Sequence, residues 1–164
     1  MAARNLKDMF VDLLQDAYSA ETQLTKALPK MAGAADNAQL RAAFEQHLRE
    51  TEQQVRRLEQ VGRKCNCDLD ENTCEAMEGL IEEGEEIIAM TADPDAKDAG
   101  LIAAAQKVEH YEIATYGTLC TWAEQLGMPD AKDLLGQSLA EEKATDAKLT
   151  RLAESVINAH AAAK

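Results

Sequence analysis

The sequence predicts an all-α protein in the form of a four-helix bundle, and three observations support this. Ala, Leu, Glu, Gln and Lys, which lose little conformational freedom in a helix, dominate the 164 residues. Aromatic residues make up 4% of the chain, which also holds only three Pro and eight Gly. Apolar residues recur at helical spacing along four long segments. The length suits one domain covering residues 1–164.

Residues that start or stop helices set the expected boundaries. Asp36 or Asn37 is a favourable N-cap for the second helix. Pro94 precedes the third helix, and Gly127 suits its end. The long helices are therefore expected at residues 5–31, 36–62, 95–127 and from 129 to about 157, followed by a frayed tail.

A connection of roughly 35 residues separates the second and third long helices. Its segment 73–90 has the apolar spacing of a short amphipathic helix, for which Asn72 and Glu75 form a capping pair. Two antiparallel hairpins joined by one long crossover have the topology of ferritin-like bundles. The expected fold is thus a ferritin-like four-helix bundle with a short fifth helix in its crossover.

Charge and hydropathy exclude several partners and locations. The net charge is −13, with 17 basic residues scattered among 30 acids, so no basic face is available for nucleic acid or an anionic membrane. The chain has no run of 18 apolar residues, and its start, MAARNLKDMF, lacks the features of a secretory signal. A cytoplasmic location is therefore expected.

The four cysteines do not suggest a disulfide framework in such a protein. Cys65, Cys67 and Cys74 have a spacing that fits a zinc site poorly, and we expect reduced thiols there, with their role left open. Cys120 lies on an apolar helix face as a small core residue.

Carboxylates interrupt the apolar face of every long helix near its middle. The stretch KVEHYEIATYG places Glu109 and Glu112 three residues apart inside the apolar face of the third helix. Glu21, Glu50 and Glu142 take corresponding positions in the other three helices. His47 lies one turn before Glu50, and Asp146 lies one turn after Glu142. The other helical acids are expected on the surface, and these are Glu52, Glu59, Glu82, Glu83, Glu85, Glu86, Glu124 and Glu141.

Such a buried group of like charges requires a cation. A buried carboxylate without a partner costs several kcal/mol, and we see no basic residue on these faces. Four glutamates would be neutralised by two divalent ions. Oxygen-rich ligation with at most one imidazole suits iron or manganese, so the sequence predicts a site for two Fe ions, or alternatively two Mn ions.

Four stretches, LLQDAYSAETQL, AMEGLIEE, LIAAAQKVEHYEIATYGTL and LAEEKATDAKLT, resemble the YciE/YciF family of bacterial stress proteins, which are ferritin-like and related to rubrerythrins. The resemblance implies a dimeric bundle with a di-iron centre. It places Glu21, Glu50, Glu109, Glu112 and Glu142 at the carboxylate positions of the rubrerythrin-like pattern. The chain departs from that pattern where Gln53, Thr145 and Asp146 stand in place of histidines.

Several roles stay open at this level. His47 is either a metal ligand or a hydrogen-bonded histidine at the core edge. Asp146 either ligates metal or accepts a hydrogen bond from His47, while His110 is expected at a helix interface. Tyr18 and Tyr116 are either hydrogen-bond partners of the ligands or ordinary core residues.

Two functions fit these residues. The first is a di-iron or di-manganese stress protein that reacts with oxygen or peroxide, as a ferroxidase or a peroxidase-like enzyme does. The second is a non-enzymatic dimeric stress or structural protein that binds metal for stability or sequestration. A homodimer is expected because the crossover and Trp122 offer more apolar surface than four helices can cover. The apolar residues of the crossover are Leu80, Ile81, Ile87 and Ile88.

Overall fold

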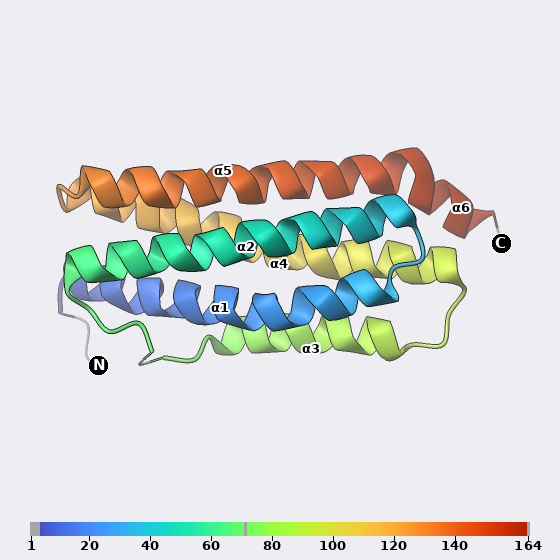
Figure 1. The fold of residues 1–164 in the computed structure, drawn as a ribbon, viewed down its shortest axis with the longest axis horizontal. Coiled ribbons are helices and arrows are strands. Elements are labelled where there is room, and N and C mark those ends of the chain that lie inside the picture. The colour runs from blue at the N-terminus through green and yellow to red at the C-terminus, as the bar shows by residue number, and fades with distance from the viewer. Residues whose placement is uncertain (1–3, 71, 164) are drawn as a thin grey trace.

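Four long helices lie side by side, and a shorter helix runs along one side of them (Figure 1). The computed structural model describes residues 4–70 and 72–163, and within these ranges it contains no strand. The helices are α1 (Leu6–Ala34), α2 (Ala38–Cys65), α3 (Glu75–Ala89), α4 (Pro94–Gln125), α5 (Pro129–Leu152) and α6 (Asn158–Ala162), with a π-helical segment (Ala153–Ile157) before α6. The predicted all-α bundle is confirmed.

The four long helices form two antiparallel hairpins. One hairpin consists of α1 and α2 and the other of α4 and α5, and each pair packs along its length (Figure 1). The chain between the hairpins carries α3, which packs against α1 and α4. This is the ferritin-like topology, with the short fifth helix in the crossover as predicted.

The helix ends follow ordinary capping chemistry. The side chain of Asn37 accepts hydrogen bonds from the backbone N–H groups of Gln39 and Leu40 and so starts α2. Pro94 occupies the first turn of α4. Gly127 has a φ of 69°, a left-handed conformation that suits glycine, in the tight turn between α4 and α5.

The predicted cap of α3 is wrong. Cys74 is the N-cap, and its Sγ accepts a hydrogen bond from the backbone N–H of Met77 at 3.4 Å. Asn72 instead donates to Asp12 and Gln15 of α1. The helix starts later because the preceding segment is bound to α1 side chains.

The C-terminal tail is helical, where the sequence suggested fraying. The π-helical segment and α6 continue from α5 and pack against α4 (Figure 1). Ile157 is buried in the core, and Leu152 and Val156 pack against the same cluster. Burial of these apolar side chains accounts for the additional turns.

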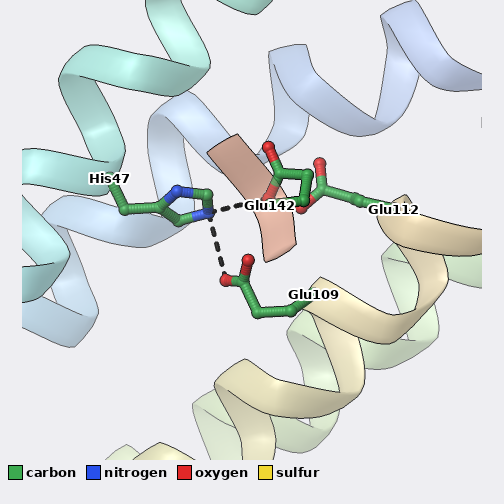
Figure 2. Close-up of side chains that lie close together, drawn as sticks. All are labelled: His47, Glu109, Glu112 and Glu142. Atoms are coloured by element: carbon green, nitrogen blue, oxygen red, sulfur yellow. Dashed lines mark ion pairs between the residues drawn. The ribbon is translucent and has the colours of Figure 1, made fainter. Parts of the chain in front are cut away.

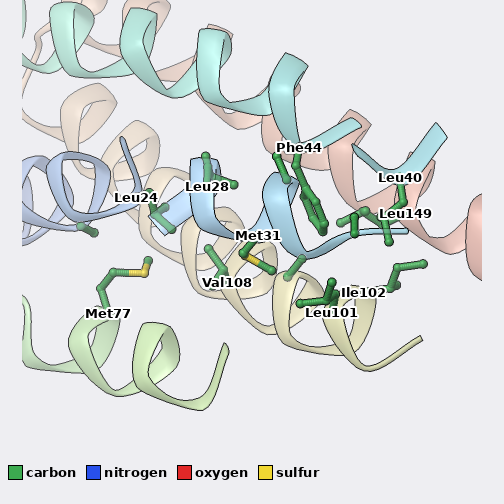
Figure 3. Close-up of a cluster of buried hydrophobic side chains, with 14 of the residues drawn as sticks. Leu24, Leu28, Met31, Leu40, Phe44, Met77, Leu101, Ile102, Val108 and Leu149 are labelled. Atoms are coloured by element: carbon green, nitrogen blue, oxygen red, sulfur yellow. The ribbon is translucent and has the colours of Figure 1, made fainter. Parts of the chain in front are cut away.

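The apolar core is divided into two clusters along the bundle. One cluster includes Leu24, Leu28, Phe44 and Leu101 and is partly drawn in Figure 3. The other, nearer the opposite ends of the helices, includes Phe10, Leu14, Leu58, Tyr116, Leu119 and Leu135. The predicted metal-ligating residues lie between these two apolar clusters.

The apolar residues of α3 do not form a free face. Leu80, Ile81, Ile87 and Ile88 are partly buried against the core cluster of α1 and α4. Trp122 likewise packs against the second cluster. The apolar surface from which we predicted a homodimer is thus largely covered within one chain. Among the described residues, none of the helices combines the length and the apolar composition of a membrane-spanning segment.

Candidate metal centre

A layer of buried polar side chains separates the two apolar clusters. All four long helices contribute to this polar layer, and its members are Glu21, His47, Thr51, Gln54, Glu109, Glu112, Thr115, Ser138, Glu142 and Thr145. Each lies near the middle of its helix, where a neighbouring helix prevents contact with water. The expected inward carboxylates of α1, α4 and α5 belong to this layer.

Four residues converge at the centre of the polar layer. His47 of α2, Glu109 and Glu112 of α4, and Glu142 of α5 each offer one ligand atom, and these atoms lie within 4.8 Å of one another (Figure 2). The Nε2 atom of His47 is 3.2 Å from Oε1 of Glu109 and 3.8 Å from Oε2 of Glu142. All four side chains are buried. We call this group the carboxylate cluster.

Glu21 of α1 lies beside the carboxylate cluster. It is fully buried, and the hydroxyl of Tyr116 donates a hydrogen bond to its Oε1. Glu112 is close enough to affect the ionisation of Glu21 directly. Tyr116 therefore fills the hydrogen-bonding role that the sequence left as one of its two alternatives, whereas Tyr18 is only partly buried.

Most side-chain nitrogen and oxygen atoms of the carboxylate cluster and Glu21 have no hydrogen-bond partner. The buried atoms without a partner are both carboxylate oxygens of Glu112, one oxygen each of Glu21, Glu109 and Glu142, and both ring nitrogens of His47. Buried polar groups are normally paired because an unpaired one loses its interaction with water without compensation. So many unpaired ligand atoms in one place fit a cation-binding site.

Burial also changes the ionisation of these acids. Desolvation raises the pKa of Glu21, Glu109 and Glu112 well above the ordinary glutamate value. The negative charge of Glu142 raises the pKa of all three further. Folding without a cation therefore favours protonated carboxyls, and a bound cation would favour the ionised forms.

Gln54 and Arg57 were not identified from the sequence. Gln54 is buried and donates hydrogen bonds to Glu142 and, at 3.1 Å, to Glu141. Arg57 binds Glu141 through two hydrogen bonds of 2.6 and 2.7 Å. Glu141, expected on the surface, is only 27% exposed and pairs with Arg57. The expectation that no basic residue lies on these faces is wrong, because Arg57 lies there and is 16% exposed. Gln54 and Arg57 follow His47 by seven and ten residues and so lie on the same inward face of α2. This helical spacing could have identified them from the sequence.

Glu50 lies at the rim of the cluster. Its side chain is 25% exposed, and its Oε2 is 3.8 Å from Nδ1 of His47. It also accepts hydrogen bonds from Gln46 at 2.8 Å and from Thr145 at 3.4 Å. The nearby His47 ring is the main reason that the pKa of Glu50 is lowered. Thus Glu50 is near the expected position but outside the group of converging ligand atoms.

Asp146 contacts Gln106 and His110 and not His47, the partner that the sequence suggested. Its Oδ1 accepts a hydrogen bond from Gln106 at 3.0 Å and lies 3.3 Å from Nε2 of His110. This pair connects α4 and α5 outside the carboxylate cluster, and His110 is 70% exposed. His110 is therefore mostly exposed, where the sequence predicted a helix interface, and its ring pairs with Asp146 of α5.

The cysteines form no metal-binding group with one another among the described residues. None of the four, all of which lie in the described residues, forms a disulfide bond. Cys74 is buried, and its Sγ lies 2.9 Å from the hydroxyl of Tyr111 on α4. Cys74 also donates its backbone N–H to Ser19 of α1, so it connects the start of α3 to two helices.

The chain is similar in sequence and fold to several known proteins. Protein YciF of Escherichia coli K12 is 54% identical over 159 residues, covering 96% of both chains. The crystal structure of the E. coli stress protein YciF matches with a TM-score of 0.92, covering 95% of this chain and 99% of that chain. YcfI from Rhodopseudomonas palustris, described as a proposed structural protein, is 45% identical with a TM-score of 0.86, covering 90% of this chain and 94% of its own.

A protein from Xanthomonas campestris, 22% identical and covered to 94% in both chains, shares the fold with a TM-score of 0.74. The family model described as a domain of unknown function, DUF892, matches residues 5–162. Since the match spans almost the whole chain, the chain belongs to the DUF892 family, in agreement with its predicted resemblance to the YciE/YciF stress proteins.

Proposed function

We propose that the carboxylate cluster and Glu21 bind two divalent iron or manganese ions, and that the protein uses them to react with oxygen or peroxide under stress. The observation that supports this most directly is the set of unpaired, buried ligand atoms contributed by all four long helices. Similarity to an E. coli stress protein agrees with a role in stress.

The donor set suits these ions. Four glutamates and one imidazole give mainly oxygen ligation, which iron and manganese accept more readily than zinc or copper do. Two divalent ions would balance the charges of Glu21, Glu109, Glu112 and Glu142, leaving a neutral group between the apolar clusters. His47, Glu21, Glu109, Glu112 and Glu142 would hold these ions.

The surrounding residues would hold these ligands in place. Gln54 orients Glu142 through its amide, and Tyr116 orients Glu21 through its hydroxyl. The apolar clusters on both sides exclude water and keep the effective dielectric constant low. When bound, the ions would supply the electrons that reduce oxygen or peroxide.

Metal analysis of protein purified without chelator tests the binding. The wild-type chain should hold two equivalents of iron or manganese, and Glu112→Gln should hold fewer. Glu52→Gln is the control because Glu52 is an exposed acid on α2. Equal metal content in all three proteins would refute the site.

The activity needs a separate test because a metal site can serve stability alone. The Fe(II)-loaded protein should consume peroxide faster than free Fe(II) at the same concentration. If two metals bind without faster consumption, the second function applies, that of a non-enzymatic stress or structural protein. Similarity to the R. palustris protein, described as a proposed structural protein, favours this alternative.

A further inference from the structure

A cleft opens to solvent between α2 and α5, beside the polar layer. Its volume is about 210 Å³, and its lining includes Gln46 and Glu50 of α2 and Ala144, Thr145 and Lys148 of α5. Two of these residues reach the buried centre. Thr145 belongs to the polar layer, and Glu50 lies at the rim of the carboxylate cluster. We call this opening the α2–α5 cleft.

The α2–α5 cleft lies on the side of the bundle away from α3. The two hairpins meet along two seams, one between α1 and α4 and the other between α2 and α5. Helix α3 packs against both α1 and α4 and so covers the first seam. It lies on the opposite side of the bundle from α5 (Figure 1). The cleft is therefore in the seam that α3 leaves open.

The acids of the proposed centre are sealed from solvent, whereas Glu50 is not. Glu50 is 25% exposed. The sealed acids are each exposed by 2% or less, and they are Glu21, Glu109, Glu112 and Glu142. A metal ion that reaches them must give up its hydration water, which is costly unless protein oxygens replace it. Glu50 offers such oxygens where the solvent ends.

Glu50 connects the cleft to the carboxylate cluster through His47. Oε2 of Glu50 lies 3.8 Å from Nδ1 of His47, and Nε2 of the same ring lies 3.2 Å from Oε1 of Glu109. His47 is 2% exposed, and neither of its nitrogens has a hydrogen-bond partner. A buried, unpaired ligand atom thus lies beside a carboxylate that solvent reaches. Ligand atoms therefore continue from the cleft to the interior.

Hydrogen bonds from both walls of the cleft hold Glu50 at this position. Gln46 donates to its Oε1 at 2.8 Å, and Thr145 donates to its Oε2 at 3.4 Å. Lys148 of α5 donates to Gln46 of α2 at 2.9 Å and so spans the cleft. The carboxylate is therefore oriented by side chains of both helices.

We propose that Glu50 is the entry residue of the metal centre: it binds a divalent iron or manganese ion in the α2–α5 cleft and transfers it to His47 and the carboxylate cluster. This inference rests on the metal-binding part of the proposed function. An entry residue lowers the barrier to uptake and to release alike, so its loss slows both and changes the affinity little. Loss of a ligand instead speeds release and weakens the affinity.

Mn(II) is the probe, with the full chain purified without metal. Electron paramagnetic resonance of the hydrated ion follows its uptake, and transfer to excess chelator follows its release. Glu50→Gln should slow both processes at least about fivefold relative to Glu52→Gln, while Kd changes by less than about threefold. Glu52 is an exposed acid of the same helix, so the control removes the same charge.

Narrowing the cleft tests the route without a change in charge. Ala144 is exposed and lines the cleft, so Ala144→Phe places an aromatic ring in its mouth. Uptake of Mn(II) should be at least about fivefold slower than in Ala140→Phe. Ala140 is the matched control because it is exposed one turn earlier on the same helix.

The positive charges of the cleft provide a test of opposite sign. Lys148 and Arg151 both line it, and each repels an entering cation. Lys148→Gln should therefore speed Mn(II) uptake at least about twofold relative to Lys143→Gln, which removes an exposed charge of the same helix. Equal rates in the two lysine variants would contradict passage of a cation beside Lys148.

The outcomes separate this inference from the proposed function. Unchanged uptake in Glu50→Gln or in Ala144→Phe, with two ions still bound, would overturn the entry route and leave the proposed function intact. A weaker affinity caused by faster release from Glu50→Gln would make Glu50 a ligand and so overturn its role as the entry residue. Failure of the wild-type chain to bind Mn(II) or Fe(II) would refute both.

Discussion

The imidazole of His47 bridges the two helical hairpins, with its Nε2 3.2 Å from Oε1 of Glu109. The same nitrogen lies 3.8 Å from Glu142 on α5, and Nδ1 lies 3.8 Å from Glu50 on its own helix. One ring is therefore close to carboxylates from three helices. Neither of its nitrogens has a hydrogen-bond partner, which suits a side chain whose partner is a metal ion.

Replacing His47 should weaken metal binding. His47→Ala removes the nitrogen donor of the proposed centre, and we expect the affinity for Fe(II) to fall by about 10–100-fold or more. Competition with a chelator under anaerobic conditions measures this. His110→Ala is the control because His110 is mostly exposed and lies outside the cluster. Equal affinities in the two variants would show that His47 is not a ligand.

Removing one buried acid should stabilise the metal-free protein. Glu112 has no hydrogen-bond partner for either oxygen, and its neighbours are also acidic. We expect Glu112→Gln to raise the free energy of unfolding at pH 7 by about 1–3 kcal/mol in the presence of chelator. Urea unfolding measures this, and Glu52→Gln should change stability by less than about 0.5 kcal/mol. Destabilisation by Glu112→Gln would contradict a repulsive cluster.

The metal-free protein should become more stable as the pH falls from 7 toward 5. The pKa values of Glu21, Glu109 and Glu112 are raised by burial and then by neighbouring acids. The folded state therefore binds more protons than the unfolded state above about pH 4.3, and stability decreases as the pH rises through the folded pKa values. The metal-loaded protein should show the opposite slope because protons displace the ions.

Melting temperatures at pH 5, 6 and 7, with chelator and with Fe(II), measure the two slopes. The net charge of −13 also favours mild acid, so a Glu109→Gln, Glu112→Gln double variant is needed as a control. Its metal-free slope should be markedly smaller. Glu50 does not interfere because its pKa is lowered, so its contribution is lost only below this pH range. Parallel slopes in the two forms would show that no metal centre is present.

Tyr116→Phe should destabilise the protein. The hydroxyl of Tyr116 is the hydrogen-bond donor to Glu21, and both residues are buried. Its loss leaves one more carboxyl oxygen unpaired, at a cost of about 1–3 kcal/mol. Tyr18→Phe is the control because Tyr18 is partly exposed. Equal urea midpoints for the two variants would remove the assigned role of Tyr116.

The homodimer also stays a prediction. Leu6 and Met9 are large exposed apolar residues near the start of α1, and Met90 is another at the end of α3. Sedimentation at micromolar concentration and physiological salt should give twice the 17.9 kDa chain mass. A single species of 17.9 kDa would contradict the dimer.

The sequence by itself determined the helices and their order. Apolar spacing, Asn37, Pro94 and Gly127 indicated the long helices to within a few residues because these signals act within one or two turns. The length of the crossover then distinguished the ferritin-like topology from a simple up-and-down bundle. The spacing of apolar residues also identified the inward acids Glu21, Glu109, Glu112 and Glu142. An acid within an apolar helix face can be recognised from the sequence of that helix alone.

Contacts between helices were decided only by the tertiary structure. Asp146 pairs with His110, Gln54 with Glu142, and Arg57 with Glu141. Helical spacing defines which face a side chain occupies, but the partner depends on the rotation and axial position of the neighbouring helix, which packing of many side chains determines together. For the same reason Glu50 lies at the rim while His47, one turn earlier on the same helix, lies at the centre.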